Sequence, residues 1–133
     1  MERYRALAGI HVLVVDDNGD GRELIKHVLL HDDARVTTAE SGAEALEILT
    51  FSVPDVLVSD IAMPSETGYW LVREIRKLPA ANGGTLPALA VTAFGAVFSR
   101  ERALEAGFND YLPKPLDPWE LCRCVARLAG RSR

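Results

Sequence analysis

Short apolar runs recur along this chain, and stretches with the 3.6-residue period of an amphipathic helix separate them. Apart from His11, the first run, Ile10–Val15, contains only Leu and β-branched residues. A continuous run of this kind is typical of a strand buried on both faces, as in a parallel sheet covered by helices. The alternation therefore predicts an α/β fold with about five parallel strands. We expect these strands at Ile10–Val15, Arg35–Ala39, Val56–Asp60, Ala88–Thr92 and Tyr111–Pro113.

Two of the helices between these strands have clear start signals. Ser41 and Glu44 form a capping box, in which each side chain accepts a hydrogen bond from the backbone N–H of the other residue. Asp117 stands directly before Pro118, which is the pattern of an N-cap followed by the first helical residue. We therefore expect helices to begin just after Ser41 and Asp117.

The remaining helices have weaker signals. Gly19 and Gly21 have low helix propensity and precede the apolar positions of Arg22–Leu30, so we expect that helix to begin late or to fray at its start. A further helix should carry Trp70 and the apolar residues after it, and a short one should cover Ser99–Ala106.

Length and composition indicate a single soluble domain. The chain has 133 residues, of which 48% are hydrophobic and 26% charged, as in an average globular protein. The formal net charge of −4 argues against nucleic-acid binding. No signal peptide and no run of about 20 apolar residues is found, so we expect a cytoplasmic protein that does not bind membranes. Cys122 and Cys124, two residues apart, predict neither a disulfide nor a metal site.

Polar residues follow four of the apolar runs, at the point where each run ends. Asp16 and Asp17 follow the first run, Asp60 ends the third, and Thr92 and Lys114 end the last two. Ligands of an open α/β sheet bind outside the carboxyl ends of its strands. We therefore expect these five side chains to share one pocket.

The chemistry of this set favours a divalent cation and phosphate. Three carboxylates at one edge raise each other's pKa unless a cation neutralises them. Oxygen ligands without His or thiolate suit Mg²⁺, with Mn²⁺ as an alternative, and Mg²⁺ leaves positions open for phosphate oxygens. The Thr92 hydroxyl and the Lys114 ammonium could then contact a phosphoryl group.

This ordered set resembles the receiver domain of the two-component response regulators, and the resemblance runs from Ile10 to about Leu128. It implies a flavodoxin-like, doubly wound sheet with strand order 2-1-3-4-5 and about five helices. We expect residues 1–133 to form one receiver domain with a core at about 10–128. The residues that carry the resemblance are Asp16-Asp17, Asp60, Met63-Pro64, Gly68, Thr92-Ala93 and Tyr111 through Lys114-Pro115.

The resemblance also implies a role for each acidic residue. Asp60 would accept a phosphoryl group from the phosphohistidine of a sensor histidine kinase or a phosphotransfer domain. Asp17, Asp60 and the backbone carbonyl of Ala62 would bind Mg²⁺, and Asp16 would act largely through a coordinated water. The chain would thus be no enzyme, apart from assisting its own phosphorylation and dephosphorylation.

Three further residues would transmit the signal. Thr92 and Lys114 would contact the phosphoryl oxygens, and Tyr111 would swing inward as Thr92 moves toward them. Lys114-Pro115 resembles a cis-proline turn of the family. Because Ala62 has no polar side chain and Phe94 is bulky, we expect an altered lifetime of the phosphorylated form.

Two alternatives have a different function. The first is an Mg²⁺-dependent aspartyl phosphohydrolase, which would need an acid at the position of Ala62. The second is a protein-binding module with the same fold that is not phosphorylated, which the complete set of polar residues disfavours.

The last helix suggests a partner surface. Its apolar stripe is expected to run along Trp119, Cys122, Val125, Ala126 and Ala129, with Leu121 and Leu128 off its centre. These two leucines either widen the buried face or belong to a homodimer surface of the last two helices.

Overall fold

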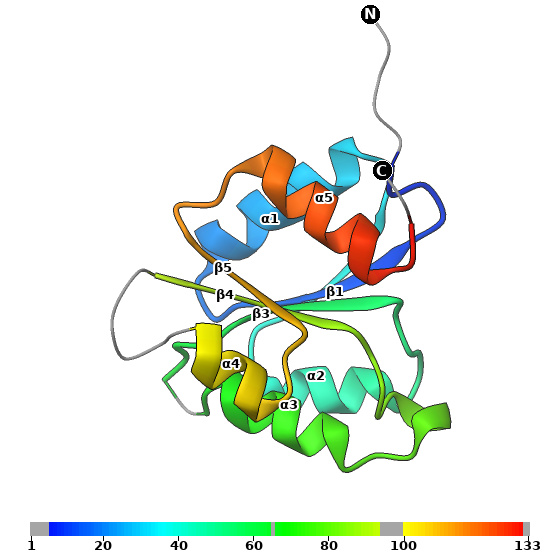
Figure 1. Ribbon diagram of the computed structural model, residues 1–133, viewed down its shortest axis with the longest axis vertical. Coiled ribbons are helices and arrows are strands. Elements are labelled where there is room, and N and C mark those ends of the chain that lie inside the picture. Colours follow the sequence, from blue (N-terminus) through cyan, green and yellow to red (C-terminus); the bar gives the residue numbers. More distant parts are fainter. Residues whose placement is uncertain (1–5, 65, 94–99, 132–133) are drawn as a thin grey trace, which may run out of the picture.

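The computed structural model describes residues 6–64, 66–93 and 100–131 (Figure 1). Its centre is a five-stranded sheet in the order β2-β1-β3-β4-β5, in which every pair is parallel. This confirms the predicted flavodoxin-like order 2-1-3-4-5. The strands are β1 (His11–Val15), β2 (Arg35–Ala39), β3 (Val56–Asp60), β4 (Ala88–Ala93) and β5 (Asp110–Lys114).

Helices cover both faces of the sheet. Figure 1 shows α1 and α5 on one face and α2, α3 and α4 on the other. The helices are α1 (Gly19–His31), α2 (Gly42–Leu49), α3 (Gly68–Arg76), α4 (Arg100–Ala106) and α5 (Pro118–Leu128), and a 3-10 turn, η1 (Ala80–Asn82), precedes β4. No helix among the described residues is long and apolar enough to cross a membrane.

The sheet separates two apolar cores. Successive strand residues point to opposite faces, so Leu13 joins the core beneath α2 and α3 while Val12 and Val14 join the core beneath α1 and α5. All three side chains are fully buried. The central strand is thus buried on both faces, as its continuous apolar run predicts.

One helix start and one capping contact differ from the prediction. α1 does not begin late: Gly19 is its first residue, because the Asn18 side chain accepts a hydrogen bond of 2.8 Å from the Gly21 N–H and caps the helix there. In α2, Ser41 caps the Glu44 N–H as expected, at 3.1 Å. Glu44 Oε1, however, accepts from the N–H of Glu40, at 2.6 Å, so the reciprocal half of the capping box is shifted by one residue.

The predicted stripe of α5 is wrong at its first turn. Trp119 is 51% exposed, whereas Leu121, expected off the centre, is 1% exposed. The buried positions are Leu121, Cys124, Val125 and Ala126. Leu121 therefore belongs to the core and is not available to a partner. The Asp117 cap is confirmed, since its side chain accepts from the Trp119 N–H at 2.9 Å.

Candidate functional site

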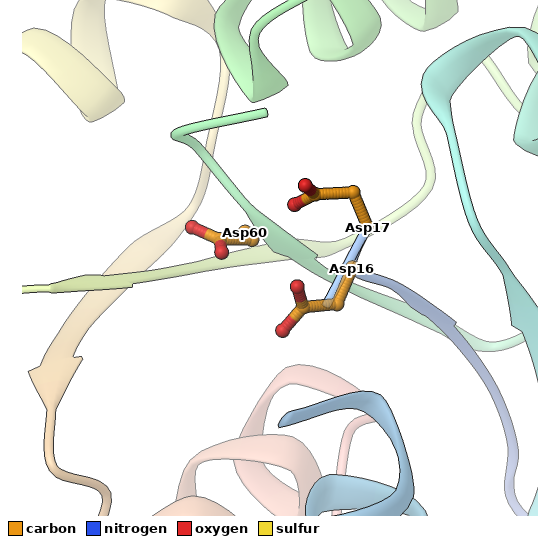
Figure 2. A group of neighbouring side chains, drawn as sticks. All are labelled: Asp16, Asp17 and Asp60. Atoms are coloured by element: carbon orange, nitrogen blue, oxygen red, sulfur yellow. The ribbon is translucent and has the colours of Figure 1, made fainter. Parts of the chain in front are cut away.

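Three carboxylates meet at the carboxyl ends of β1 and β3. Asp16 and Asp17 directly follow β1, Asp60 ends β3, and these two strands are neighbours in the sheet. One carboxylate oxygen from each residue lies within 4.8 Å of the other two. Figure 2 shows the three side chains grouped at the strand ends. Asp16 and Asp60 are buried and Asp17 is exposed, so the cluster is accessible to solvent through Asp17. The prediction that the strand ends bring these acids together is confirmed.

Lys114 reaches this cluster from the end of β5. Its Nζ lies 3.2 Å from Asp16 Oδ2 and 3.3 Å from Asp60 Oδ2. The ammonium group therefore bridges the two buried acids. The following Lys114–Pro115 peptide bond is cis, as the resemblance implies.

Backbone groups hold the other oxygens of the buried acids. The N–H of Asn18 donates to Asp16 Oδ1 at 2.9 Å, and the N–H of Ala62 donates to Asp60 Oδ1 at 3.1 Å. Each buried carboxylate thus has one oxygen held by the backbone and one facing Lys114. Such fixed partners orient both carboxylates before any ligand binds.

Burial and charge shift the pKa values of the bridged pair. Burial raises the pKa of Asp60, an effect that the nearby Lys114 opposes and the Asp16 charge reinforces. Burial alone would lower the pKa of Lys114, but Asp60 and Asp16 outweigh it and raise that pKa. Lys114 therefore keeps its positive charge at neutral pH, as a group that compensates negative charge must.

Thr92 and Tyr111 lie on one face of the sheet. Thr92 belongs to β4, and Tyr111 of β5 is in register with Ala90, two residues before Thr92. Residues two apart on a strand share a face, so the two side chains point the same way. Thr92 Oγ1 is buried without a hydrogen-bond partner among the residues described. Phe94 lies outside the described residues.

Gly68 allows α3 to begin directly against β3. Its N–H donates to the Ile61 carbonyl at 2.8 Å. A Cβ at this position would collide with the Asp60 carbonyl oxygen and would lie 2.9 Å from Ile61 Cα. Only glycine permits this approach without a shift of the backbone that carries Asp60.

Arg22 also touches the site and was not predicted. Its Nη1 donates to the Asp16 carbonyl oxygen at 2.8 Å. In the sequence Arg22 looks like one more polar residue of an amphipathic helix. Because α1 begins at Gly19 and not later, its first turn places Arg22 over the end of β1. The expected late helix start did not predict this position.

The donors fit a hard divalent cation. The acidic cluster offers only oxygen atoms, which Mg²⁺ prefers as ligands. Because Asp17 is exposed, a cation can reach the cluster from solvent. The buried Thr92 hydroxyl could donate a hydrogen bond to a phosphoryl oxygen. No other group of three or more His, Cys, Asp or Glu side chains in the described part of the chain could hold a metal ion.

Sequence comparison links the chain to one family. The family model of the response regulator receiver domain matches residues 12–126. An uncharacterised 14.6 kDa protein of Leptolyngbya boryana is 47% identical over 91% of this chain and 91% of its own length. Response regulator MprA of Mycobacterium ulcerans is 37% identical over 93% of this chain, which spans 52% of MprA. The chain thus covers about half of this longer relative.

A solved structure shows the same fold. The receiver domain of the sensor histidine kinase PA1611 from Pseudomonas aeruginosa is 36% identical, with a TM-score of 0.83 over 92% of this chain and 99% of that one. That crystal structure contains a magnesium ion coordinated in the active-site cleft.

Proposed function

Because this chain belongs to the response regulator receiver domain family of two-component and phosphorelay systems, we propose that its Asp60 carboxylate is the phosphoacceptor. The observation that carries the proposal is the position of Asp60 at the end of β3, 3.3 Å from the Lys114 ammonium and within the acidic cluster. The donor would be the phosphohistidine of a sensor histidine kinase or of a phosphotransfer domain.

The proposed reaction is an in-line displacement at phosphorus. One oxygen of ionised Asp60 forms the new O–P bond, while the P–N bond of phosphohistidine breaks and its electron pair leaves with the imidazole nitrogen. Lys114 compensates the charge on the phosphoryl oxygens, and the buried Thr92 hydroxyl donates a hydrogen bond to one of them. Movement of Thr92 toward this oxygen makes room for Tyr111 on the same face, which is the proposed switch.

Asp16, Asp17, Asp60 and the Ala62 carbonyl would hold the cation. When bound, Mg²⁺ supplies the positive charge that the phosphoryl oxygens need as they approach three acids. The oxygen-only donor set and the magnesium ion of the PA1611 receiver support this choice. Mn²⁺, with the same ligand preference, should replace it.

Phosphohydrolase activity on external substrates is not favoured. Such a reaction needs an acid and base next to the nucleophile. Ala62, two residues after Asp60, offers only its backbone, and its N–H already donates to Asp60 Oδ1. A receiver domain is a signalling module that is phosphorylated, and the acidic cluster beside Lys114 supports that role for this chain.

The decisive experiment is phosphorylation with acetyl phosphate and MgCl₂. Intact-protein mass spectrometry should show one added phosphoryl group in the wild type, and none without the divalent cation. Asp60→Asn keeps the shape of the side chain without its charge and should show none. An adduct of equal yield in Asp60→Asn, or no adduct in the folded wild type, would contradict the proposal.

Dimerisation through the last two helices stays a prediction, and its test needs an exposed position on α5. Leu121→Glu would disrupt the core, since Leu121 is 1% exposed. The half-exposed Trp119 is the suitable position, and Trp119→Glu should prevent a phosphorylation-dependent rise in mass measured by light scattering. A cytoplasmic location and the absence of nucleic-acid binding also stay predictions.

A further inference from the structure

α4 is weakly anchored to the rest of the protein. It has 7 residues, and its buried residues are Ala103 and Ala106. Alanine has little side-chain area to bury, so hydrophobic stabilisation contributes little to the position of this helix. Leu104, its one large apolar residue, is 43% exposed. The contacts of its polar side chains therefore matter more than in the other helices.

Two arginines of α4 reach in different directions. Arg100 Nη2 lies 2.8 Å from Asp110 Oδ1, at the start of β5. Arg102 lies over the ring of Tyr69 in α3, with its Cζ 5.9 Å from the ring centroid. Figure 1 shows α3 and α4 side by side on one face of the sheet. The Arg102–Tyr69 contact is thus a cation–π interaction between two helices.

Tyr69 connects this contact to the site. It follows Gly68, the residue that packs against the Asp60 carbonyl, and it is only 7% exposed. It belongs to the apolar core against which the partly buried Tyr111 packs. Burial raises the pKa of Tyr69, Arg102 lowers it and Tyr111 raises it, so both side chains lie within electrostatic reach of the phenol.

We infer that Tyr69 and Arg102 form a clamp that holds α4 against α3 in the resting conformation and opposes the Thr92–Tyr111 switch. Both are positioning residues, because they act through Tyr111 and α4 and not on the phosphoryl group. This inference rests on the proposed function: the Tyr69–Arg102 contact would restrain the conformational switch that phosphorylation of Asp60 triggers. A contact that favours the resting conformation must lower the affinity for any ligand that favours the switched one.

The structure supplies a matched control. Arg73 also lies over the Tyr69 ring, with its Cζ 5.9 Å from the centroid, but it belongs to α3 itself. Arg73 and Arg102 are both exposed. Arg73→Gln and Arg102→Gln therefore remove the same charge from the same ring, and only the second removes a contact between helices.

The test is a titration of the full chain with beryllofluoride and Mg²⁺. It is followed by the fluorescence of Trp70, which adjoins Tyr69 in the sequence, with Trp119→Phe in every variant so that Trp70 alone reports. Arg102→Gln should bind about two to five times more tightly than the wild type, the factor expected from losing one exposed cation–π contact. Arg73→Gln should bind like the wild type, and Arg102→Lys, which keeps a cation over the ring, should restore most of the difference. If Arg102→Gln only damaged the fold, it would weaken beryllofluoride binding instead of strengthening it.

The outcomes separate the two proposals. Equal affinities of Arg102→Gln and Arg73→Gln, or weaker binding by Arg102→Gln, overturn the clamp and leave the phosphoacceptor role untouched. Absence of binding by the folded wild type, or unchanged binding by Asp60→Asn, overturns the proposed function first.

Discussion

Two buried aspartates show how differently one side chain can behave in this protein. The side chains of Asp60 and Asp110 are both 10% exposed. Burial is the largest influence on each, and it raises the pKa of Asp60. At Asp110 the combined partners outweigh burial and hold the pKa below the usual range. These partners are the Tyr111 N–H, the Cys124 thiol and the guanidinium groups of Arg100 and Arg127.

We expect opposite effects of Asp60→Asn and Asp110→Asn on stability at pH 7. Asp60→Asn removes a poorly compensated buried charge and should stabilise the fold by roughly 0.5–2 kcal/mol. Asp110→Asn removes a well-paired one and should destabilise it by about 1–3 kcal/mol. Urea unfolding monitored by circular dichroism measures both.

The pH dependence of stability distinguishes the unfavourable buried charge of Asp60 from the well-paired charge of Asp110. A raised folded pKa means that the folded state binds the proton more tightly, so the gain from Asp60→Asn should shrink as pH falls from 7 through that pKa toward the unfolded value of about 3.9. The stability that Asp110 contributes is present above about pH 3.9 and should be lost only as pH falls through its lowered folded pKa. A gain from Asp60→Asn that stays constant down to pH 4 would contradict the assignment to a buried charge.

At the scale of elements, one arginine connects α3 to the segment before β4 and to the segment between α4 and β5. Arg76 Nη1 donates to the carbonyls of Leu86 and Gly84, at 2.7 and 3.2 Å. Nε donates to the Gly107 carbonyl at 3.0 Å, and Nη2 to Asn109 Oδ1 at 3.1 Å. A single planar guanidinium thus donates to four acceptors on two segments of the chain.

Replacing Arg76 should loosen these segments together. Arg76→Lys retains the charge but not the planar fork, and we expect it to lower the free energy of unfolding by about 2–3 kcal/mol. Hydrogen exchange should rise at the starts of β4 and β5. As a comparison, Lys77→Gln removes a side chain that is 71% exposed and pairs with Glu74 on the surface, and should change stability by at most about 0.5 kcal/mol. Equal effects of the two variants would show that the Arg76 network is not specific.

Local signals predicted most elements, and the errors have local causes. Asp117 caps α5 as expected, because an N-cap acts within one turn of the chain. The start of α1 was wrong because propensity counted Gly19 and Gly21 but not the Asn18 cap. In α5, periodicity alone did not tell Trp119 from Leu121, since the face that is buried depends on where α1 and the sheet lie.

For the whole molecule, the two helical layers share one sheet, and each carries one tryptophan. Trp70 lies on α3 and Trp119 on α5, on opposite faces of the sheet, and they are 36% and 51% exposed. Trp70→Phe and Trp119→Phe therefore leave a single fluorescent reporter on one layer or the other.

We expect both variants to unfold in urea with one midpoint and one slope, equal within error to those from circular dichroism. The central strands belong to both cores, so neither layer keeps a complete core without the other. This result would agree with the prediction of a single domain. Two midpoints that differ by more than the change in stability caused by each substitution would contradict it.

The sequence predicted the site better than its surroundings. Parallel topology brings strand ends together whatever the loops do, so Asp16, Asp60 and Lys114 were expected at one edge and are found there. Arg22 and Tyr69 were missed because their contacts depend on helix placement and side-chain direction. Such contacts leave no periodic pattern in a single sequence.

Lys114 meets its two acids across long stretches of chain. It is separated from Asp16 by 98 positions in sequence and from Asp60 by 54. Closing such large loops is entropically unfavourable until the intervening strands have paired. In the unfolded chain, Lys114 is therefore not held near Asp16 and Asp60. Of the five strands in this sheet, β5 is also the last to leave the ribosome. If Asp60 is the phosphoacceptor, a nascent chain therefore stays inert toward its kinase until synthesis has passed Lys114, and competence for signalling is itself a test of complete folding.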